Sequence, residues 1–248
     1  MEKKYLILSD IHGNLSALHA VQRDCKKEIF NGVILLGDCI DYGMRSNEVI
    51  EELRQLESCS WNGKIMVNLW GNHEKLMRDK DLEHLSSDRG RVMANYTRRH
   101  LTQTTLDYIE NRMNPNGYAE FNLEGMDAFA VHGSCEDYYW KAILPDNLHG
   151  DYRKHSIVFS GHSHYPHCFT KFYDVENEVL RNKKAVIFIN PGSVGQPRNQ
   201  NPCAQYAVLH LPSKRTELRA AAYDVKYEQS LFPDEVDMFY KKRLEAGI

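Results

Sequence analysis

The apolar positions in the first third of the chain form short runs separated by helix-like segments. Residues 5–9, 33–36 and 65–70 are apolar runs too short for helices, so we predict a buried β-strand in each. The segments between them carry apolar residues at helical spacing, and Asn14 and Ser46 are suited to cap their first turns. Strand–helix–strand–helix–strand order is typical of parallel strands joined by helical crossovers. We therefore expect a parallel sheet in this part of the chain.

The remainder of the chain has a different pattern. Residues 75–113 are charged and periodic, which predicts a helical segment, broken near 86–90, that forms a cap beside a site. From residue 117 onward strand-like runs dominate, beginning with a hairpin whose turn is at 124–127. The strands predicted here are 118–123, 128–131, 156–160, 185–189, 206–211 and 216–224, followed by a helix over 227–246.

These elements predict two sheets in an α/β fold. The first half of the chain is expected to build one α/β sheet and the second half a more antiparallel one. Packing the two face to face, with helices outside, would bury both. No linker rich in Gly, Ser or Pro, no repeat and no low-complexity tract divides the sequence. We expect a single domain over residues 1–248, which is an ordinary length for an α/β protein.

Composition and charge place the chain among soluble globular proteins. Hydrophobic residues make up 42% and charged residues 26% of the sequence. The formal net charge is only −3, which does not indicate counterion-driven binding to nucleic acid, so nucleic acid is considered only as a candidate substrate. No heptad seam or sustained apolar helix face stands out, so the pattern predicts no particular oligomeric state.

The chain has the features expected of a cytoplasmic protein. Its N-terminal apolar run is too short for a signal peptide, and there is no run of about 20 apolar residues that would span a membrane. The six cysteines include no CxxC pair, which favours reduced thiols over a disulfide framework. We expect a cytoplasmic protein with no membrane partner.

Polar segments rich in metal ligands follow the predicted strands. The carboxyl ends of parallel strands gather side chains from distant parts of a chain, and oxygen and nitrogen ligands suit divalent first-row metals. One such segment alone has an ordinary interpretation as a turn, but five in one chain predict a metal site. The segments are Asp10-Ile11-His12, Gly37-Asp38-Cys39-Ile40-Asp41, Gly71-Asn72-His73-Glu74, Val131-His132-Gly133 and Gly161-His162-Ser163-His164.

Hydrolysis at two metal ions requires hard ligands, one of them shared, and open positions for water and substrate. Asp10 and His12 leave the same strand end and can hold one ion, while Asp38 has two carboxylate oxygens and can bridge. Asn72 offers an amide oxygen, a neutral ligand that limits the negative charge facing an anionic substrate. The set is completed by three histidines from later in the chain, His132, His162 and His164.

The five segments, taken in order, resemble those of the calcineurin-like metallophosphoesterases. The family pattern is Asp-x-His, Gly-Asp-x-x-Asp, Gly-Asn-His-Asp/Glu, a Gly- or Val-flanked His and Gly-His-x-His, and all five blocks occur between residues 10 and 164. The resemblance implies a four-layer α/β/β/α sandwich of two mixed sheets flanked by helices. It also implies one ion held by Asp10, His12, Asp38 and His164, and a second held by Asp38, Asn72, His132 and His162.

Two further stretches are similar to one branch of that family. Residues 190–198, Asn-Pro-Gly-Ser-Val-Gly-Gln-Pro-Arg, and residues 47–50, Asn-Glu-Val-Ile, resemble those of small bacterial and archaeal predicted phosphodiesterases. Phosphoprotein phosphatases of the same superfamily have an arginine directly after the second Asp of the Gly-Asp block. Tyr42 occupies that position here, which removes a phosphate-binding guanidinium and weakens the protein-phosphatase interpretation.

His73 and Asp41 are the candidate catalytic side chains. In the predicted reaction, a hydroxide that bridges the two ions attacks phosphorus in line. His73 is the natural general acid for the leaving oxygen because the preceding residue is held by metal, and Asp41 can orient its imidazole, a pairing that the family resemblance supports. Arg198, Asn72 and Tyr42 are candidates for substrate contacts. The alternative is that Arg198 is a surface residue on a Pro/Gly loop and that Tyr42 only packs.

The sequence thus predicts a metallophosphoesterase whose substrate is a phosphate ester, with phosphodiesters first and a nucleotide among the candidates. The alternatives are a phosphomonoesterase or protein phosphatase, a dinucleoside polyphosphate hydrolase and a non-catalytic scaffold of the same fold. The complete ligand set and the presence of His73 argue against the scaffold. Mixed nitrogen and oxygen ligation suits two divalent transition-metal ions, and we expect manganese before iron, zinc, nickel or cobalt.

Overall fold

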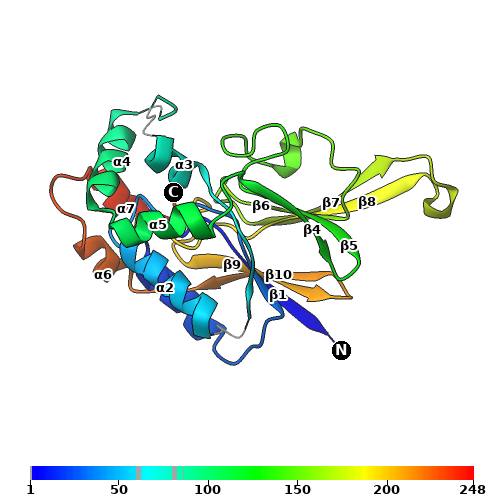
Figure 1. Ribbon diagram of the computed structural model, residues 1–248, viewed down its shortest axis with the longest axis horizontal. Coiled ribbons are helices and arrows are strands. Elements are labelled where there is room, and N and C mark those ends of the chain that lie inside the picture. Colours follow the sequence, from blue (N-terminus) through cyan, green and yellow to red (C-terminus); the bar gives the residue numbers. More distant parts are fainter. Residues whose placement is uncertain (1, 60–62, 80–82, 86) are drawn as a thin grey trace.

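The three strands at the start of the chain lie side by side in a five-stranded sheet (Figure 1). The computed structural model describes residues 2–59, 63–79, 83–85 and 87–248. β1 pairs in parallel with β2, and β2 with β3, while the other side of β1 pairs antiparallel with β9, which pairs with β10. The bounds are β1 (Lys3–Leu8), β2 (Gly32–Leu35), β3 (Ile65–Asn68), β9 (Ala204–Leu211) and β10 (Arg215–Ala221).

A second five-stranded sheet has the order β4-β5-β6-β8-β7. β5, β6 and β8 are parallel neighbours, whereas the edge strands β4 and β7 pair antiparallel. The predicted hairpin joins β4 to β5 through Glu124 and Gly125, both of which have positive φ. The bounds are β4 (Tyr118–Leu123), β5 (Met126–Val131), β6 (Ile157–Ser160), β7 (His167–Asp174) and β8 (Lys183–Asn190).

The predicted division of the chain between the two sheets is wrong. β9 and β10 come from the second half of the chain but complete the first sheet, and each sheet has two parallel and two antiparallel pairings. All eight residues of β9 are buried, as expected of a central strand, but that pattern does not reveal which sheet a strand joins. β7 was missed because most of its side chains are half-buried or exposed and show no apolar run.

The helices begin and end close to the predicted positions, with three corrections. The segment predicted at 75–113 contains three helices; Ser87 caps the second, and Ser86 of the predicted break lies outside the described residues. The predicted C-terminal helix is two helices, because the intervening stretch contains Pro233. Ser46 lies inside its helix, and its hydroxyl accepts from the Asp41 N–H.

Asn14 caps the first helix as predicted, accepting from the Ala17 N–H at 3.0 Å. The bounds are α1 (Leu15–Asp24), α2 (Ser46–Cys59), α3 (Asn72–Asp79), α4 (Asp88–His100), α5 (Gln103–Arg112), α6 (Val225–Ser230) and α7 (Met238–Ala246), with short 3₁₀ turns at Pro145–Asn147 and Glu178–Leu180.

Alternating side chains of the strands build separate apolar layers. In β1, Tyr5 and Ile7 face the second sheet, and Leu6 and Leu8 face helices α1, α2 and α5. The outer face of the second sheet packs against residues of the 133–156 segment. The predicted sandwich of two mixed sheets flanked by helices is therefore confirmed.

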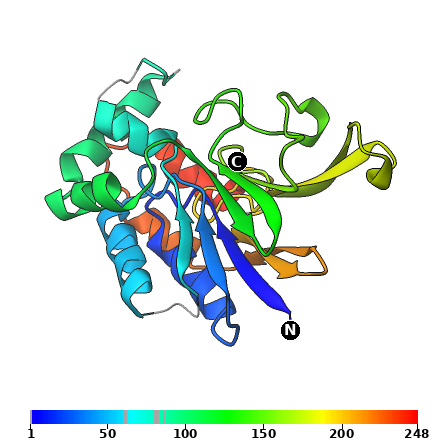
Figure 2. The same cartoon turned by 45° about the vertical axis from the view of Figure 1, so that its right-hand side comes forward.

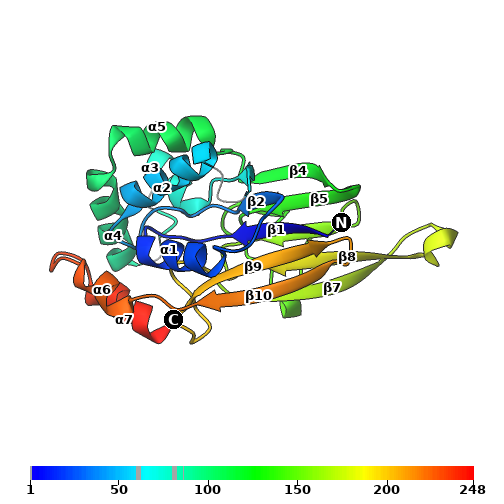
Figure 3. The ribbon, with the colours of Figure 1, turned by 90° about the horizontal axis from the view of Figure 1, so that it is seen from below.

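The helices gather at one end of the sheets, and the hairpin of β7 and β8 projects from the other (Figures 1 and 3). Helices α4 and α7 share one apolar cluster that includes Met93, Tyr240 and Leu244. Helix α7, drawn in red, lies on the side of the molecule where the other helices gather (Figure 2). The five cysteines whose side chains the structure describes are all free thiols. In the described ranges, no helix combines the length and apolar character needed to cross a bilayer.

Candidate metal centre

Loops that follow five strands meet at the helical end of the sheets. Main-chain hydrogen bonds join them: the Asp10 N–H donates to Gly37 O at 3.0 Å, and the Gly161 N–H to His132 O at 2.9 Å. This edge is where parallel strands deliver side chains to a common site. The predicted ligands and the strands they follow are Asp10 and His12 after β1, Asp38 after β2, Asn72 after β3, His132 after β5, and His162 and His164 after β6.

One group of ligand atoms surrounds Asp10. Nε2 of His164 lies 3.1 Å from Oδ1 of Asp10, and Nε2 of His12 lies 3.8 Å from the same oxygen. Nε2 of His12 is also 3.7 Å from Oδ2 of Asp38. All four side chains are buried, and their ligand atoms lie within 4.8 Å of one another. The group therefore has the size and the donor types of a site for one metal ion.

A second group shares Asp38 with the first. Nε2 of His132 lies 3.3 Å from Oδ2 of Asp38, and the ligand atoms of Asp38, His132 and His162 fall within 4.8 Å of one another. Oδ1 of Asn72 contacts Nε2 of His132 at 3.0 Å and Nδ1 of His162 at 2.9 Å. The structure thus brings all seven predicted ligands together, in two groups that meet at Asp38.

Each of the four histidines turns one ring nitrogen away from the centre toward a main-chain carbonyl. Because a carbonyl oxygen only accepts, that nitrogen carries a hydrogen and fixes the orientation of the ring. The contacts are His12 Nδ1 to Ile40 O at 3.1 Å, His132 Nδ1 to Leu36 O at 2.7 Å, His164 Nδ1 to Gln196 O at 2.5 Å and His162 Nε2 to Trp140 O at 3.1 Å.

The opposite ring nitrogens face the centre. Nε2 of His12 and Nε2 of His164 lie 3.3 Å apart, and with hydrogens on their Nδ1 atoms both neutral rings present lone pairs. Oδ1 of Asp10 is buried without a hydrogen-bond partner in the described part of the chain. Buried acceptors that face one another are unfavourable unless a cation lies between them. The residues present therefore fit a divalent transition-metal ion.

Burial and neighbouring charges set the protonation of the ligands. Burial lowers the pKa of His12 and His164 and brings the pKa of His162 to about 4, so these rings are neutral at pH 7. Burial would raise the pKa of Asp38, but the histidines around it, His132 first, hold that pKa well below its usual range. Burial would lower the pKa of His132, but Asp38 raises it to about 9, so metal binding would displace a proton there.

Seven residues of the site have a left-handed backbone conformation, with φ between 48° and 70°. Such non-glycine residues cost on the order of 1–3 kcal/mol each and persist only where the surroundings hold them. The loop after β8 supplies some of this support, because Ser193 Oγ and the Gly195 N–H both donate to Asp10 O. The seven residues are Asp10, His12, Asp38, Asp41, Tyr42, His162 and His164.

His73 lies beside the ligand groups. Its Nδ1 is 2.7 Å from Oδ2 of Asp41, and its Nε2 is 4.0 Å from Oδ2 of Asp38. Thr97 of α4 donates its hydroxyl to the other Asp41 oxygen at 2.6 Å. Burial would lower the pKa of His73, but Tyr42, Asp38 and Asp41 together raise it to about 10. The imidazole is therefore protonated and held on the Asp38 side of the centre.

Glu74 has a structural role that the sequence interpretation did not assign, although the residue belongs to the Gly-Asn-His-Glu block. Its buried carboxylate accepts from the N–H groups of Gly71 at 2.8 Å, Asp38 at 2.9 Å and Cys39 at 2.8 Å. The contacts hold the loop after β2 against the start of α3. A Cβ at Gly71 would lie 2.1 Å from Oδ1 of Asp38, so only glycine fits there.

Replacing Glu74 by glutamine is expected to lower the free energy of unfolding by about 1–3 kcal/mol. The glutamine NH₂ would replace one carboxylate oxygen that now accepts from main-chain N–H groups. At least one of these N–H groups would then have no acceptor. Urea denaturation of the metal-free protein measures the change. Exposed Glu48 provides the control, since Glu48→Gln is expected to stay within about 0.5 kcal/mol. Equal stability of both variants would contradict the role given to Glu74.

The two other predicted substrate-contact residues also lie near the centre. The half-buried Tyr42 ring has its centroid 4.7 Å from that of His12 and 4.5 Å from that of His73. Arg198 is half-buried, and its Nε has no hydrogen-bond partner among the described residues. Burial first, and then the charge of Arg198, lowers the pKa of His164. Arg198 is two residues after Gln196, whose main-chain oxygen contacts Nδ1 of His164 at 2.5 Å.

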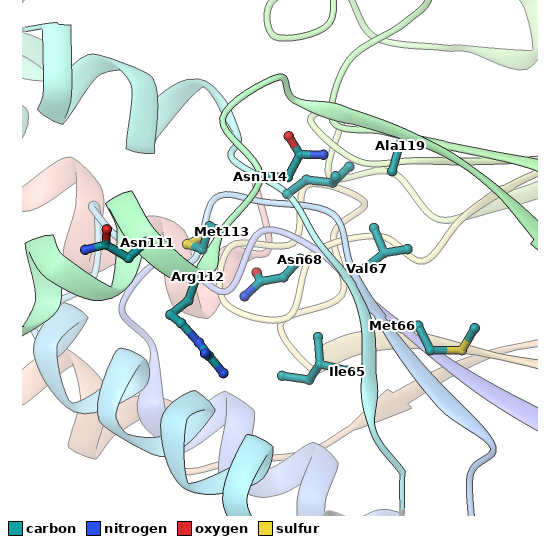
Figure 4. Close-up of a pocket in the computed structure, with 10 residues that line it drawn as sticks. Ile65, Met66, Val67, Asn68, Asn111, Arg112, Met113, Asn114 and Ala119 are labelled. Atoms are coloured by element: carbon teal, nitrogen blue, oxygen red, sulfur yellow. The ribbon is translucent and has the colours of Figure 1, made fainter.

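A cavity of about 410 Å³ lies apart from the centre, along the edge strand β3 (Figure 4). Its walls come from β3, the end of α5 and the start of β4, and include Asn68, Met113, Asn114 and Ala119. No candidate metal ligand lines it. The chemistry of the ligand groups therefore does not involve this cavity.

The chain matches known proteins over most of its length. The calcineurin-like phosphoesterase superfamily domain matches residues 4–214. An uncharacterized protein from Methanocaldococcus jannaschii is 27% identical over 224 residues, which are 89% of this chain and 88% of that protein. A metallophosphoesterase from Sphaerobacter thermophilus superposes with a TM-score of 0.71 at 26% identity, over 99% of this chain and 100% of that one. A hypothetical protein from Pyrococcus horikoshii OT3 shares the fold, with a TM-score of 0.79 at 20% identity over 99% and 98% of the two chains.

Buried acids and imidazoles gather at the strand ends of a two-sheet α/β sandwich, where they form a candidate metal-binding site. The chain belongs to the calcineurin-like phosphoesterase superfamily. The predicted family is therefore confirmed, and phosphate esters are the substrates that this family implies.

Proposed function

We propose that the protein is a phosphodiesterase that uses two divalent transition-metal ions, with manganese as the first candidate. The observation that carries the proposal is the pair of buried ligand groups that share Asp38. Sharing a carboxylate places two ions close together, as hydrolysis at a two-metal centre requires. When bound, the ions would lower the pKa of a water nucleophile and offset the charge of the phosphoryl oxygens.

His73 acts as the general acid in this proposal. Its Nδ1 is held by Asp41, and Thr97 fixes Asp41 in turn, so the Nε2–H is the proton available to the leaving oxygen. Its main-chain N–H donates to Oδ1 of Asp38 at 2.8 Å, which ties the acid to the shared ligand. Proton donation to the leaving group contributes about 10²–10⁴ in rate.

Substrate contacts are assigned to Arg198, Asn72 and Tyr42. The charge of Arg198 acts on His164 and suits a non-transferred phosphate or another anionic group of the substrate next to the cleaved ester. Asn72 contacts two of the ligand histidines, and Tyr42 forms the wall next to His73. Tyr42 in place of an arginine makes a phosphomonoesterase or protein phosphatase the second candidate rather than the first. The segment around α4 and α5 serves as a cap beside these residues.

A comparison of two aryl esters tests the proposed reaction. The metal-free protein, reloaded with each metal in turn, is assayed with bis(p-nitrophenyl) phosphate and with p-nitrophenyl phosphate. We expect turnover of both only with metal, and a higher kcat/KM for the diester. A higher kcat/KM for the monoester would favour the phosphomonoesterase. No turnover of either ester by protein with bound metal would favour a non-catalytic scaffold. The metal form that is active is then assayed with a panel of nucleotides, including dinucleoside polyphosphates.

A further inference from the structure

Three arginines from distant parts of the chain form a cluster beside the metal centre, called here the arginine cluster: Arg89, Arg198 and Arg243. The Phe239 ring links two of them, with Cζ of Arg89 3.8 Å and Cζ of Arg243 5.1 Å from its centroid. The Gln200 N–H donates to Gly247 O at 2.8 Å, which joins the loop that carries Arg198 to the end of α7. Burial, and after it the charge of Arg198, lowers the pKa of Arg243 to about 10. The three come from α4, α7 and the loop after β8.

Tyr42 connects this cluster to the metal centre. Cζ of Arg243 lies 5.7 Å from the Tyr42 ring centroid, and the same ring lies beside His12 and His73. Arg198 lies two residues after Gln196, whose main-chain oxygen accepts a hydrogen bond from Nδ1 of His164. A group bound by the cluster would therefore be adjacent to an ester bound at the metal ligands.

Over the described ranges, no Asp or Glu side chain lies within ion-pair distance of any guanidinium of the arginine cluster. Nε of Arg243 donates to the oxygen of Ile248 at 2.7 Å, and Nε of Arg198 is buried without a partner. By contrast, Arg91, two residues after Arg89 on α4, pairs with Asp88 at 2.7 Å. Three positive charges gathered without acidic side chains create a positive potential that attracts an anion.

A buried amide beside the cluster also lacks a partner. The Gln196 side chain is 1% exposed, and neither its nitrogen nor its oxygen has a hydrogen-bond partner in the described structure. Leaving such a group unpaired is unfavourable, so a buried unpaired amide indicates a missing polar partner. This observation is independent of the charges and lies on the same loop as Arg198.

We propose that the arginine cluster binds a second phosphate group of the substrate, so that the natural substrate carries a phosphate or diphosphate beyond the ester that is cleaved. Guanidinium forks match phosphate oxygens in geometry and remain charged at all relevant pH values. The inference rests on the proposed function for the position of the cleaved ester. It narrows the substrate class from phosphate esters in general to compounds with two phosphoryl groups.

Calorimetric titration of the manganese-loaded protein with methylenebisphosphonate and with methylphosphonate tests the proposal without turnover. Arg198→Gln and Arg89→Gln are each expected to weaken bisphosphonate binding by about tenfold or more, because each removes charge-assisted hydrogen bonds. Methylphosphonate affinity is expected to change by less than about twofold. Arg91→Gln, on the same helix as Arg89, is the matched control and leaves both affinities unchanged. Thermal melting verifies that each variant is folded.

Two results would overturn the proposal. If the bisphosphonate affinity of both variants equals that of Arg91→Gln, the metals alone bind the second group. If methylphosphonate binding falls as much as bisphosphonate binding, the arginines contact the cleaved ester instead. A protein that hydrolyses neither aryl ester but shows the arginine-dependent bisphosphonate affinity would refute the proposed function and retain the second phosphate site.

Discussion

Replacing Asp38 by asparagine is expected to lower kcat, measured with metal present in the assay, by at least about 1000-fold. Among the described residues, Asp38 alone belongs to both ligand groups, so loss of its charge weakens the binding of both ions at once. The amide has the same shape, and its oxygen can still accept from the His73 N–H that now donates to Asp38. The fold should therefore persist while the metals are lost. Turnover of bis(p-nitrophenyl) phosphate and metal content by mass spectrometry measure the two effects.

Asp107 provides the control for this substitution. It is exposed on α5 and lies outside both ligand groups, and among the described residues its carboxylate contacts Gln103 of the same helix. Asp107→Asn should keep both metals and full turnover. An Asp38→Asn protein that still binds two ions would show that the shared ligand has been assigned wrongly.

Replacing His73 by asparagine is expected to reduce kcat by about 10²–10⁴ while both metals remain bound. The asparagine amide can reproduce the contact of Nδ1 with Asp41 but has no group in place of Nε2. The loss should be larger for an alkyl or nucleoside leaving group than for p-nitrophenolate, because a poor leaving group depends more on protonation. If His73 only positioned other groups or stabilised the fold, the rates with the good and the poor leaving group would fall equally.

The half-exposed His19 supplies the comparison for His73, since it lies on α1, outside both ligand groups, and its ring contacts Glu52. His19→Asn should leave both rates and the metal content unchanged. If His73→Asn loses its metals, or retains full activity on the poor leaving group, the general-acid role is wrong.

The sequence was sufficient to identify the candidate ligands because each one lies within four residues of the end of a strand. Asp10 after β1 and Asp38 after β2 needed only the apolar runs and the rule that parallel strands end at one edge. The separation of ligands into two groups that share Asp38 came from the family resemblance, and the structure places the atoms in that arrangement.

Contacts between distant segments were beyond the sequence pattern. Thr97 reaches Asp41 from α4, and Arg243 reaches Tyr42 from α7, yet both are ordinary helix residues by their spacing. β9 belongs to the first sheet through its pairing with β1. Its own apolar run does not indicate which strand it pairs with. Glu74 belongs to the Gly-Asn-His-Glu segment found in the sequence. Its structural role is evident only from the three main-chain N–H groups that donate to its carboxylate.

Anomalous diffraction from crystals grown with manganese tests the two-ion centre most directly. We predict two peaks, one bonded by Asp10, His12 and His164 and the other by Asn72, His132 and His162, with Asp38 bonded to both. A single peak, or none at these side chains in manganese-saturated crystals, would contradict the two-metal phosphoesterase described here.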